Sequence, residues 1–394
     1  MRVYLDHNAG SPVRPSVRRA IARCMEEERG NPASAHRSGQ RARRELERAR
    51  ERVAGLLGAR PETIVFTSGG AESNNLAIFG AARAAGSRRR IVSSTIEHSS
   101  ILAPLADLEA RGFEVVLLAP DRDGRIDAEK AAAVIDDSVA LVTLGLVNAE
   151  VGAIQQVAPI AEAARRARTV FHLDAAQAAG RTPIDVRSPG CDLMTVSAHK
   201  IGGPSGIGAL YCADEARIAP IILGGPQERG MRAGTPNLPG AVGFGAAAEE
   251  VASALHAETS RIASLANTLL ESLLAAIPGL ELNGPRLDRV PNTLNLTFPG
   301  VLGESLLMAL DLEGVEVSMG SACAAGAVEP SHVLIAMGRS ASAARSSLRI
   351  SLGWPTTDEE IAFAAAAIAR VWRRVAEAEP VAELRDSGAA EAMR

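Results

Sequence analysis

Short apolar runs alternate with helix-like runs along the first half of this chain, and this alternation limits the possible folds most strongly. The strand-like runs are Thr63–Thr67, Arg90–Ser94, Glu114–Leu118, Leu141–Leu146, Val170–Leu173, Leu193–Ser197 and Gly208–Tyr211. The helical patterns between them include Leu76–Ala84, Ser100–Arg111, Ala128–Ile135 and Pro159–Arg168. Repeated strand and helix indicate an α/β fold, in which helices cover both faces of a mostly parallel sheet.

A second, smaller unit follows a long helical segment, Pro239 to about Leu274, which we expect to bridge two domains. Its predicted strands are Leu280–Asn283, Thr293–Phe298, Val315–Ser318 and Ser347–Ser351, and its predicted helices are Leu302–Leu312, Pro330–Met337 and Thr357–Glu377. We therefore divide the 394 residues into three parts. Residues 1–15 form an N-terminal segment that packs with the small domain, 16–250 form the large domain, and 251–394 form the small α+β domain.

Polar or glycine residues follow five of the predicted strands, close to where each strand ends. They are Gly69 and Gly70, His98, Asn148, Asp174 and Lys200. The carboxyl ends of parallel strands meet at one edge of a sheet, where open α/β folds bind their ligands. Five such positions therefore predict a functional crevice at this edge.

Lys200 is one of only two lysines in a chain whose lysine and arginine total is 42. Arginine cannot act as a nucleophilic amine, because its guanidinium stays protonated. The other lysine, Lys130, lies in a pattern typical of a solvated helix turn. This leaves Lys200 for an amine-dependent reaction such as Schiff-base formation. The alternative is that Lys200 was retained by chance or for a salt bridge.

The strand Thr63–Thr67 runs into the glycine turn Ser68-Gly69-Gly70-Ala71, which opens a helix. Such a turn aims backbone N–H groups and the positive end of the helix dipole at an anion, so it predicts a phosphate site. It matches neither G-x-G-x-x-G nor a Walker A loop, which disfavours dinucleotides and nucleoside triphosphates. A tight turn that binds nothing is the alternative.

Asp174, just beyond a predicted strand, can keep a pyridinium nitrogen protonated, as a pyridoxal phosphate (PLP) ring requires. Gln177, about one turn later, could donate to the phenolic oxygen of such a ring. His98 could stack on the ring or shuttle protons. The alternatives are helix N-capping by Asp174 and a purely structural histidine.

Composition argues against several classes of function. The formal net charge is −4 and aromatic residues make up 3%, so the chain offers neither a basic field nor stacking platforms for nucleic acid. The cysteines Cys24, Cys191, Cys212 and Cys323 form no C-x-x-C pair, so we expect no metal site and a reducing compartment. No signal-peptide pattern and no apolar run of about 18 residues occurs, which favours a cytoplasmic protein.

Several motifs between Tyr4 and about Val371 together carry a family resemblance. They are Leu5-Asp6-His7-Asn8-Ala9, Gly30-Asn31-Pro32-Ala33-Ser34, Thr67-Ser68-Gly69-Gly70, Thr95-Ile96-Glu97-His98, Val147-Asn148-Ala149-Glu150-Val151-Gly152, Asp174-Ala175-Ala176-Gln177, Ser197-Ala198-His199-Lys200, Arg229-Gly230-Met231-Arg232-Ala233-Gly234-Thr235, Gly320-Ser321-Ala322-Cys323 and Ser347-Leu348-Arg349-Ile350-Ser351-Leu352-Gly353. The chain resembles the fold-type I PLP enzymes of the class V aminotransferase family, most closely cysteine desulfurases of the NifS/IscS type. The resemblance implies a large domain built on a mostly parallel seven-stranded sheet flanked by helices, plus a smaller α+β C-terminal domain.

The resemblance also implies a role for each candidate residue. Lys200 binds the cofactor covalently and moves protons at the substrate α-carbon. The implied cofactor contacts are Asp174 at the pyridine nitrogen, Gln177 at the ring oxygen, His98 stacked on the ring, Gly69, Gly70, Ala71, Ser197 and His199 at the phosphate, Asn148 in the same crevice, and Thr235 at the phosphate of the neighbouring subunit's cofactor. Asn148 and Arg349 bind the substrate carboxylate, Arg349 by a bidentate clamp.

Cys323 is, by the same resemblance, the nucleophile that takes sulfur from the substrate as a persulfide. It lies in a run of small residues, which is typical of a mobile loop. The implied reaction converts L-cysteine to L-alanine in a homodimer, and sulfur passes to an acceptor protein such as an iron–sulfur scaffold. We expect no membrane and no direct nucleic-acid partner. The alternatives are another class V enzyme, such as an aminotransferase or selenocysteine lyase, and a non-catalytic scaffold with this fold.

Three departures from the family pattern affect the expected site. Ala71 replaces a threonine beside the glycine turn, Gly10-Ser11 replace a Thr-Thr pair, and Met319 stands where serine is usual. A hydrogen bond is typically worth about 0.5–1.5 kcal/mol, so Ala71 predicts weaker cofactor affinity rather than its loss. The other two changes affect the acceptor and the substrate preference.

Overall fold

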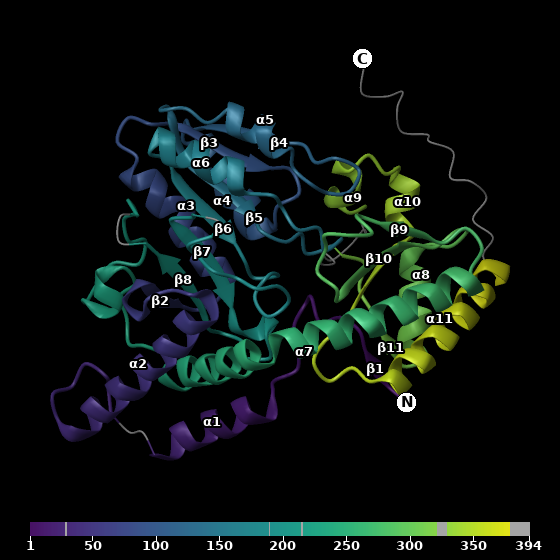
Figure 1. The fold of residues 1–394 in the computed structure, drawn as a ribbon, viewed down its shortest axis with the longest axis horizontal. Helices are drawn as coiled ribbons and strands as arrows, with labels where there is room; N and C mark the ends of the chain where they lie inside the picture. The colour runs from purple at the N-terminus through teal and green to yellow at the C-terminus, as the bar shows by residue number, and fades with distance from the viewer. Residues whose placement is uncertain (28–29, 189, 214–215, 321–328, 379–394) are drawn as a thin grey trace.

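A seven-stranded sheet lies at the centre of the larger part of the molecule (Figure 1). The computed structural model describes residues 1–27, 30–188, 190–213, 216–320 and 329–378. Its strands are β2 (Ile64–Thr67), β3 (Arg90–Ser94), β4 (Glu114–Leu118), β5 (Val139–Gly145), β6 (Val170–Asp174), β7 (Leu193–Ser197) and β8 (Gly208–Cys212). Their order across the sheet is β2-β8-β7-β6-β5-β3-β4.

Within this sheet only β8 runs against the other strands. It is antiparallel to both of its neighbours, β2 and β7. The pairs from β7 through β6, β5 and β3 to β4 are all parallel. The reversal follows from the connection, residues 198–207, which is shorter than the roughly dozen residues of a parallel crossover. The predicted α/β fold with a mostly parallel seven-stranded sheet is confirmed.

Alternate strand residues face two different layers of helices. Ile64 and Phe66 of β2 pack in a cluster with residues of α1 (Pro15–Glu27), α2 (Arg37–Leu57), α5 (Ala128–Ala133) and α6 (Ala158–Ala167). Val65, between them, packs instead with residues of α3 (Gly70–Ala84). Leu141 of β5 packs with α3 and α4 (Ser99–Ala110), and its neighbour Val142 packs in the first cluster. Both faces of the sheet are therefore covered.

A smaller α+β part follows in the chain, as predicted. Its antiparallel sheet has the order β12-β10-β9, from β9 (Glu281–Asn283), β10 (Thr293–Thr297) and β12 (Ser347–Ser351). The N-terminal β1 (Val3–Tyr4) pairs in parallel with β11 (Val315–Glu316). The helices are α8 (Gly303–Leu312), α9 (His332–Ala336), α10 (Ala341–Arg345) and α11 (Asp358–Ala378).

The long helix α7 (Leu238–Ala276) runs from one part to the other (Figure 1). Its first half places Phe244 and Val251 in the core beneath the large sheet. Its second half places Leu265 and Leu269 in a separate core, which also contains Leu5 of the N-terminal segment. These two cores support the domain boundaries at 15/16 and 250/251, which remain predictions.

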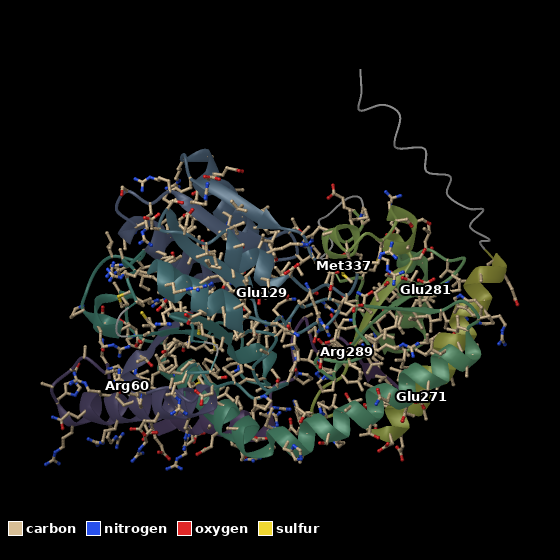
Figure 2. All side chains as sticks on the ribbon, turned by 45° about the horizontal axis from the view of Figure 1, so that its top comes forward. Arg60, Glu129, Glu271, Glu281, Arg289 and Met337 are labelled. Carbon is tan, nitrogen blue, oxygen red and sulfur yellow. The ribbon has the colours of Figure 1, made fainter. Side chains whose placement is uncertain are left out.

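The two parts also meet away from α7, near two residues labelled in Figure 2. Met337 follows α9, yet its side chain belongs to the core of the large sheet. The backbone of Arg289, before β10, forms an isolated bridge with Ala153. The junction therefore involves several segments.

Most helices differ from the predicted bounds by a few residues at their ends, and two differ more. Helix α3 begins at Gly70 rather than Leu76, so the second glycine of the turn already belongs to the helix. Helix α10 was not predicted. Among the residues that the structure describes, no helix combines the length and apolar character needed to cross a membrane.

Candidate active site

The carboxyl ends of the parallel strands lie side by side and bring the predicted residues together. In the register of the sheet, Gly145 at the end of β5 pairs with Asp174 at the end of β6. Lys200 follows the adjacent β7 in a 3₁₀ turn. The charges of Asp174 and Lys200 both act on His98, which follows β3. The predicted crevice at this edge therefore contains groups from four strand ends.

Lys200 is half-buried and points at backbone carbonyl groups. Its Nζ donates to the carbonyl oxygens of Asn8 at 2.5 Å and Ala9 at 3.0 Å. The contacts of the described residues include no ion pair of Lys200, whereas the exposed Lys130 pairs with Asp127 at 3.2 Å. The contacts therefore do not support the alternative that Lys200 was retained for a salt bridge.

The surroundings of Lys200 favour the neutral amine. Burial, and then the positive charges of Arg181 and Arg349, lower the pKa of Lys200 to about 8. Asp174 and Asp6 act in the opposite direction. About a tenth of the amine is therefore unprotonated at pH 7, far more than for an ordinary lysine, and the neutral form is the one that a nucleophilic lysine uses.

Asp174 accepts one hydrogen bond from helix α3 and one from the turn that follows β6. Its Oδ2 accepts from Asn74 Nδ2 at 2.7 Å, and its Oδ1 accepts from the backbone N–H of Ala176 at 2.9 Å. A turn follows Asp174, not a helix, so it is not the N-cap that the alternative interpretation required. A carboxylate has about four acceptor positions, so Asp174 can accept a further hydrogen bond from a ligand.

His98 is the N-cap of α4. Its Nδ1 accepts from the backbone N–H of Ser100 at 3.1 Å. The loss of hydration lowers the pKa of His98, and Lys200 and His332 lower it further, against the opposing effect of Asp174. The cap explains why a histidine occurs here structurally, but it leaves the ring faces available for stacking.

The glycine turn between β2 and α3 lies against the end of β7. A Cβ built on Gly70 would lie 3.6 Å from Ser197 Cβ, so the two backbones approach closely. Ser197 Oγ lies 2.9 Å from His199 Nδ1. Burial, and then Lys200 and Arg181, lower the pKa of His199 to about 4, so its imidazole is neutral. Ala71 is exposed in the first turn of α3.

Gln177 is held by two contacts of its side-chain amide. Its Nε2 donates to the carbonyl oxygen of Asn8 at 3.0 Å, the same oxygen that accepts from Lys200. Its Oε1 accepts from Arg181 Nη1. These partners orient the amide so that its donors face the Lys200 side.

Asn148 has a structural use in the turn after β5. Its Oδ1 accepts from the backbone N–H groups of Glu150 and Val151 at 2.9 and 3.0 Å, and its Nδ2 donates to Ile96 O at 3.2 Å. An amide has two N–H donors, so one remains for a ligand. Its predicted contact with substrate or cofactor remains a prediction.

Arg349 in β12 reaches the crevice from the smaller part of the molecule. Its Nη2 donates to Asp6 Oδ1 at 2.8 Å, and its Nη1 donates to the carbonyl oxygens of Ala149 and Gly320 at 3.4 Å. Its buried Nε has no hydrogen-bond partner among the described residues. A guanidinium with an unused donor can bind an added carboxylate.

Thr235 is exposed, in a loop that is bonded to β2 and α3. Glu228 anchors this loop, because its carboxylate accepts from Arg50 Nη1 at 2.7 Å and from the backbone N–H of Phe66 at 2.9 Å. Arg232 donates from Nε to Glu72 Oε1 at 2.9 Å, in the first turn of α3. The loop is thus fixed beside the glycine turn.

Cys323 lies outside the residues that the structure describes. The segment that contains it follows Gly320 and precedes α9. Met319, one of the departures from the family pattern, is 9% exposed and packs in the core of the smaller part. Of the remaining cysteines, Cys24 and Cys191 are buried and Cys212 is half-buried.

The sequence analysis assigned no role to Asn74, Arg181 or Asp6, although each contacts a candidate residue. Asn74 lies four residues after Gly70 in α3, a spacing that puts both on one face of the helix. Arg181 lies four residues after Gln177, but in a chain with many arginines this spacing alone does not single it out. Asp6 is part of a quoted motif, but nothing in its sequence neighbourhood indicates a contact with Arg349.

Comparison with known proteins identifies extensive similarity. The model of the family "Aminotransferase class-V" matches residues 3–363. The cysteine desulfurase IscS of Dictyoglomus turgidum is 40% identical over 370 residues, which cover 94% of this chain and 94% of that protein. A cysteine desulfurase of Cereibacter sphaeroides is 44% identical over 362 residues, which cover 91% of this chain and 93% of that protein.

Solved structures share the fold. A NifS-like protein superposes with a TM-score of 0.89 at 34% identity, over 95% of this chain and all of that one. A structure described as SspA in complex with cysteine superposes with a TM-score of 0.79 at 35% identity, over 89% of this chain and 98% of that one.

Proposed function

Because this chain belongs to the class-V aminotransferase family, we propose that it is a PLP-dependent cysteine desulfurase that converts L-cysteine to L-alanine. The observation that carries the proposal is the position of Lys200 Nζ. It lies at the carboxyl edge of the sheet, bonded to two neutral carbonyl oxygens. The amine is partly buried, and no carboxylate among the described residues forms an ion pair with it.

The donor set of the crevice fits PLP, on which this family depends. The turn at Gly69 and Gly70 opens a helix of 15 residues, and the first N–H groups of a helix attract a phosphate. Ser197 and His199 would add side-chain contacts to that phosphate. Asp174 would hold the pyridine nitrogen, with Asn74 fixing its carboxylate.

Gln177, His98 and Thr235 complete the proposed cofactor site. The amide of Gln177 is oriented with Nε2 toward the Lys200 side, where it would donate to the ring oxygen. His98 would stack on the ring. The exposed Thr235 would reach the phosphate in a second copy of the chain, so we propose a homodimer.

When bound, PLP supplies an electron sink for bond breaking at the substrate α-carbon. Lys200 would take a proton from the α-carbon and return it. Its pKa of about 8 is close to neutral pH, which suits a group that both accepts and donates a proton. Arg349 would bind the substrate carboxylate together with Asn148. Asp6 would be displaced from Arg349 as the substrate enters.

Cys323 would accept the sulfur as a persulfide and pass it to an acceptor protein, such as an iron–sulfur scaffold. A thiol with this role must stay reduced between cycles, which suits the cytoplasm. We propose this location and this class of partner from the chemistry of the thiol.

The two lysines allow a matched test of the proposed amine. Lys200→Ala should lose the PLP absorbance that remains after gel filtration, and release of alanine from cysteine should fall at least about 1000-fold. Lys130→Ala removes the other lysine, which is exposed, and should change neither measurement. Normal alanine release by a folded Lys200→Ala variant would contradict the proposal.

A further inference from the structure

Arg181 is a buried cation without a carboxylate partner among the described residues. Three other arginines are at most 5% exposed, and each has an ion pair at 2.7–2.8 Å: Arg14 with Glu250 and Glu258, Arg50 with Glu228, and Arg349 with Asp6. Arg181 is 8% exposed, and its described partners are all neutral oxygens. A buried charge that is not paired is costly, so its position requires an explanation.

The contacts of Arg181 lead directly to the oxygen that holds Lys200. Arg181 Nη1 donates to Gln177 Oε1, Gln177 Nε2 donates to Asn8 O at 3.0 Å, and Lys200 Nζ donates to the same Asn8 O at 2.5 Å. Arg181 Nη2 also donates to the carbonyl oxygen of His7 at 3.2 Å. The guanidinium therefore fixes both the amide of Gln177 and the turn that carries the acceptors of Nζ.

The charge of Arg181 acts on the same groups. It lowers the pKa of Lys200, where it follows burial as the largest cause, and it contributes to the low pKa values of His199 and His7. The other groups that act on Lys200 are Arg349, in the same direction, and Asp174 and Asp6, in the opposite direction; the imidazoles of His98 and His199 also adjoin it. Of the two arginines that lower the pKa of Lys200, Arg349 is paired with Asp6. Arg181 has no carboxylate partner among the described residues, and it contacts Gln177.

We propose that Arg181 is a positioning residue that holds Gln177 and the His7–Ala9 turn around Lys200 and, through its unpaired charge, favours the free amine over the ammonium. It does not need to touch substrate or cofactor. The inference rests on the proposed function only in taking Lys200 as the reactive amine. The test measures the labelling of the Lys200 amine in the cofactor-free protein. A failed desulfurase assay would therefore leave this inference unaffected.

The test uses competitive acetylation of cofactor-free protein across a pH series, with Lys130 as the internal reference. Mass spectrometry then reports the labelling of the Lys200 peptide relative to the Lys130 peptide. In the wild type, half-maximal labelling of Lys200 is expected near pH 8. In Arg181→Met the midpoint should rise by about one pH unit, which means about tenfold less free amine at pH 7.

Two further variants separate charge from structure. Arg187→Met removes an exposed arginine from the same region, paired with Asp185, and should leave the midpoint unchanged. Arg181→Lys keeps an amine at this position but loses the forked donor geometry, so it should weaken PLP binding through Gln177. A folded Arg181→Met protein with the wild-type midpoint would overturn the proposal. If that variant does not fold, a midpoint near the ordinary lysine value of about 10.4 in the wild type overturns the proposal equally.

Discussion

Glu97 is a buried residue next to His98, and its carboxyl group accepts two hydrogen bonds in the described structure. Its Oε1 accepts from Ser94 Oγ at 2.5 Å and its Oε2 accepts from the backbone N–H of Gly145 at 2.7 Å. Burial raises the pKa of Glu97 to about 7, these two hydrogen bonds oppose that rise, and Asp174 adds to it. The folded protein therefore carries an acid that is largely protonated at slightly acidic pH.

The raised pKa of Glu97 predicts a pH-dependent cost in stability. In the unfolded chain the group ionises near its ordinary value of 4.5, so the cost is absent below that pH, grows as the pH rises toward 7 and is complete above it. Glu97→Gln should therefore raise the melting temperature of the cofactor-free protein at pH 8 but not at pH 4.5. The corresponding increase in the free energy of unfolding at pH 8 is on the order of 2–3 kcal/mol at most.

Glu129→Gln provides the control for the Glu97 prediction, because Glu129 is exposed on α5 (Figure 2). It should change the melting temperature little at either pH. An equal effect of Glu97→Gln at both pH values would show that folding does not raise the pKa of Glu97, which would contradict this prediction.

The connection from β2 to α3 depends on the absence of a side chain at Gly208 in β8. A Cβ on Gly208 would lie 2.7 Å from the carbonyl carbon of Gly69, 2.8 Å from its Cα and 2.9 Å from Val196 O. All three are backbone atoms, which cannot move aside by changing rotamer. Gly208 therefore sets the distance between β8 and the proposed phosphate turn.

Gly208→Ala should displace the Gly69–Gly70 turn and weaken PLP binding by about 10–100-fold, or roughly 1.4–3 kcal/mol. Equilibrium titration of the cofactor-free protein with PLP measures this. The matched control is Gly55→Ala in α2, where a Cβ meets nothing within 4 Å. That change should leave the affinity for PLP unchanged and stabilise the helix by up to about 1 kcal/mol. Unchanged affinity in a folded Gly208→Ala variant would place the phosphate elsewhere.

The central strands could be predicted from the sequence because both of their faces are buried, so each is a mostly apolar run. The edge strand β4 is an apolar run as well, although its residues are half-buried or exposed. β3, β4 and β7 match the predicted bounds. Helix α10 could not be predicted, because Ala341–Arg345 is too short to show a helical period. The reversal of β8 was not predicted, although the short connection of residues 198–207, which favours an antiparallel pair, is visible in the sequence.

The same limit applies to the candidate active site. Residues that follow strands, such as Asp174 and Lys200, could be placed at one edge, since parallel strands end together. Arg181 and Glu97 could not, because their importance comes from what packs around them. An arginine in a chain with many arginines carries no signal until its lack of a carboxylate partner is visible.

At the scale of the whole molecule, the proposed reaction joins groups from both parts. Lys200 and Asp174 come from the edge of the large sheet, whereas Arg349 comes from β12 and Cys323 follows β11 in the chain. The N-terminal segment lies between them, because Asn8 accepts from Lys200 and Asp6 accepts from Arg349. The proposed transfer of sulfur to Cys323 would therefore depend on both parts of the chain.

Mass spectrometry of the PLP-loaded protein after brief exposure to L-cysteine tests the proposed desulfurase reaction most directly. We predict one added sulfur atom on the peptide that contains Cys323, removable by a thiol reductant, and none on the peptide that contains Cys212. Cys323→Ala should carry no added sulfur, and Cys212→Ala should behave as the wild type does. Alanine formation at the normal rate with an unmodified Cys323, or by Cys323→Ala, would contradict the proposed persulfide route.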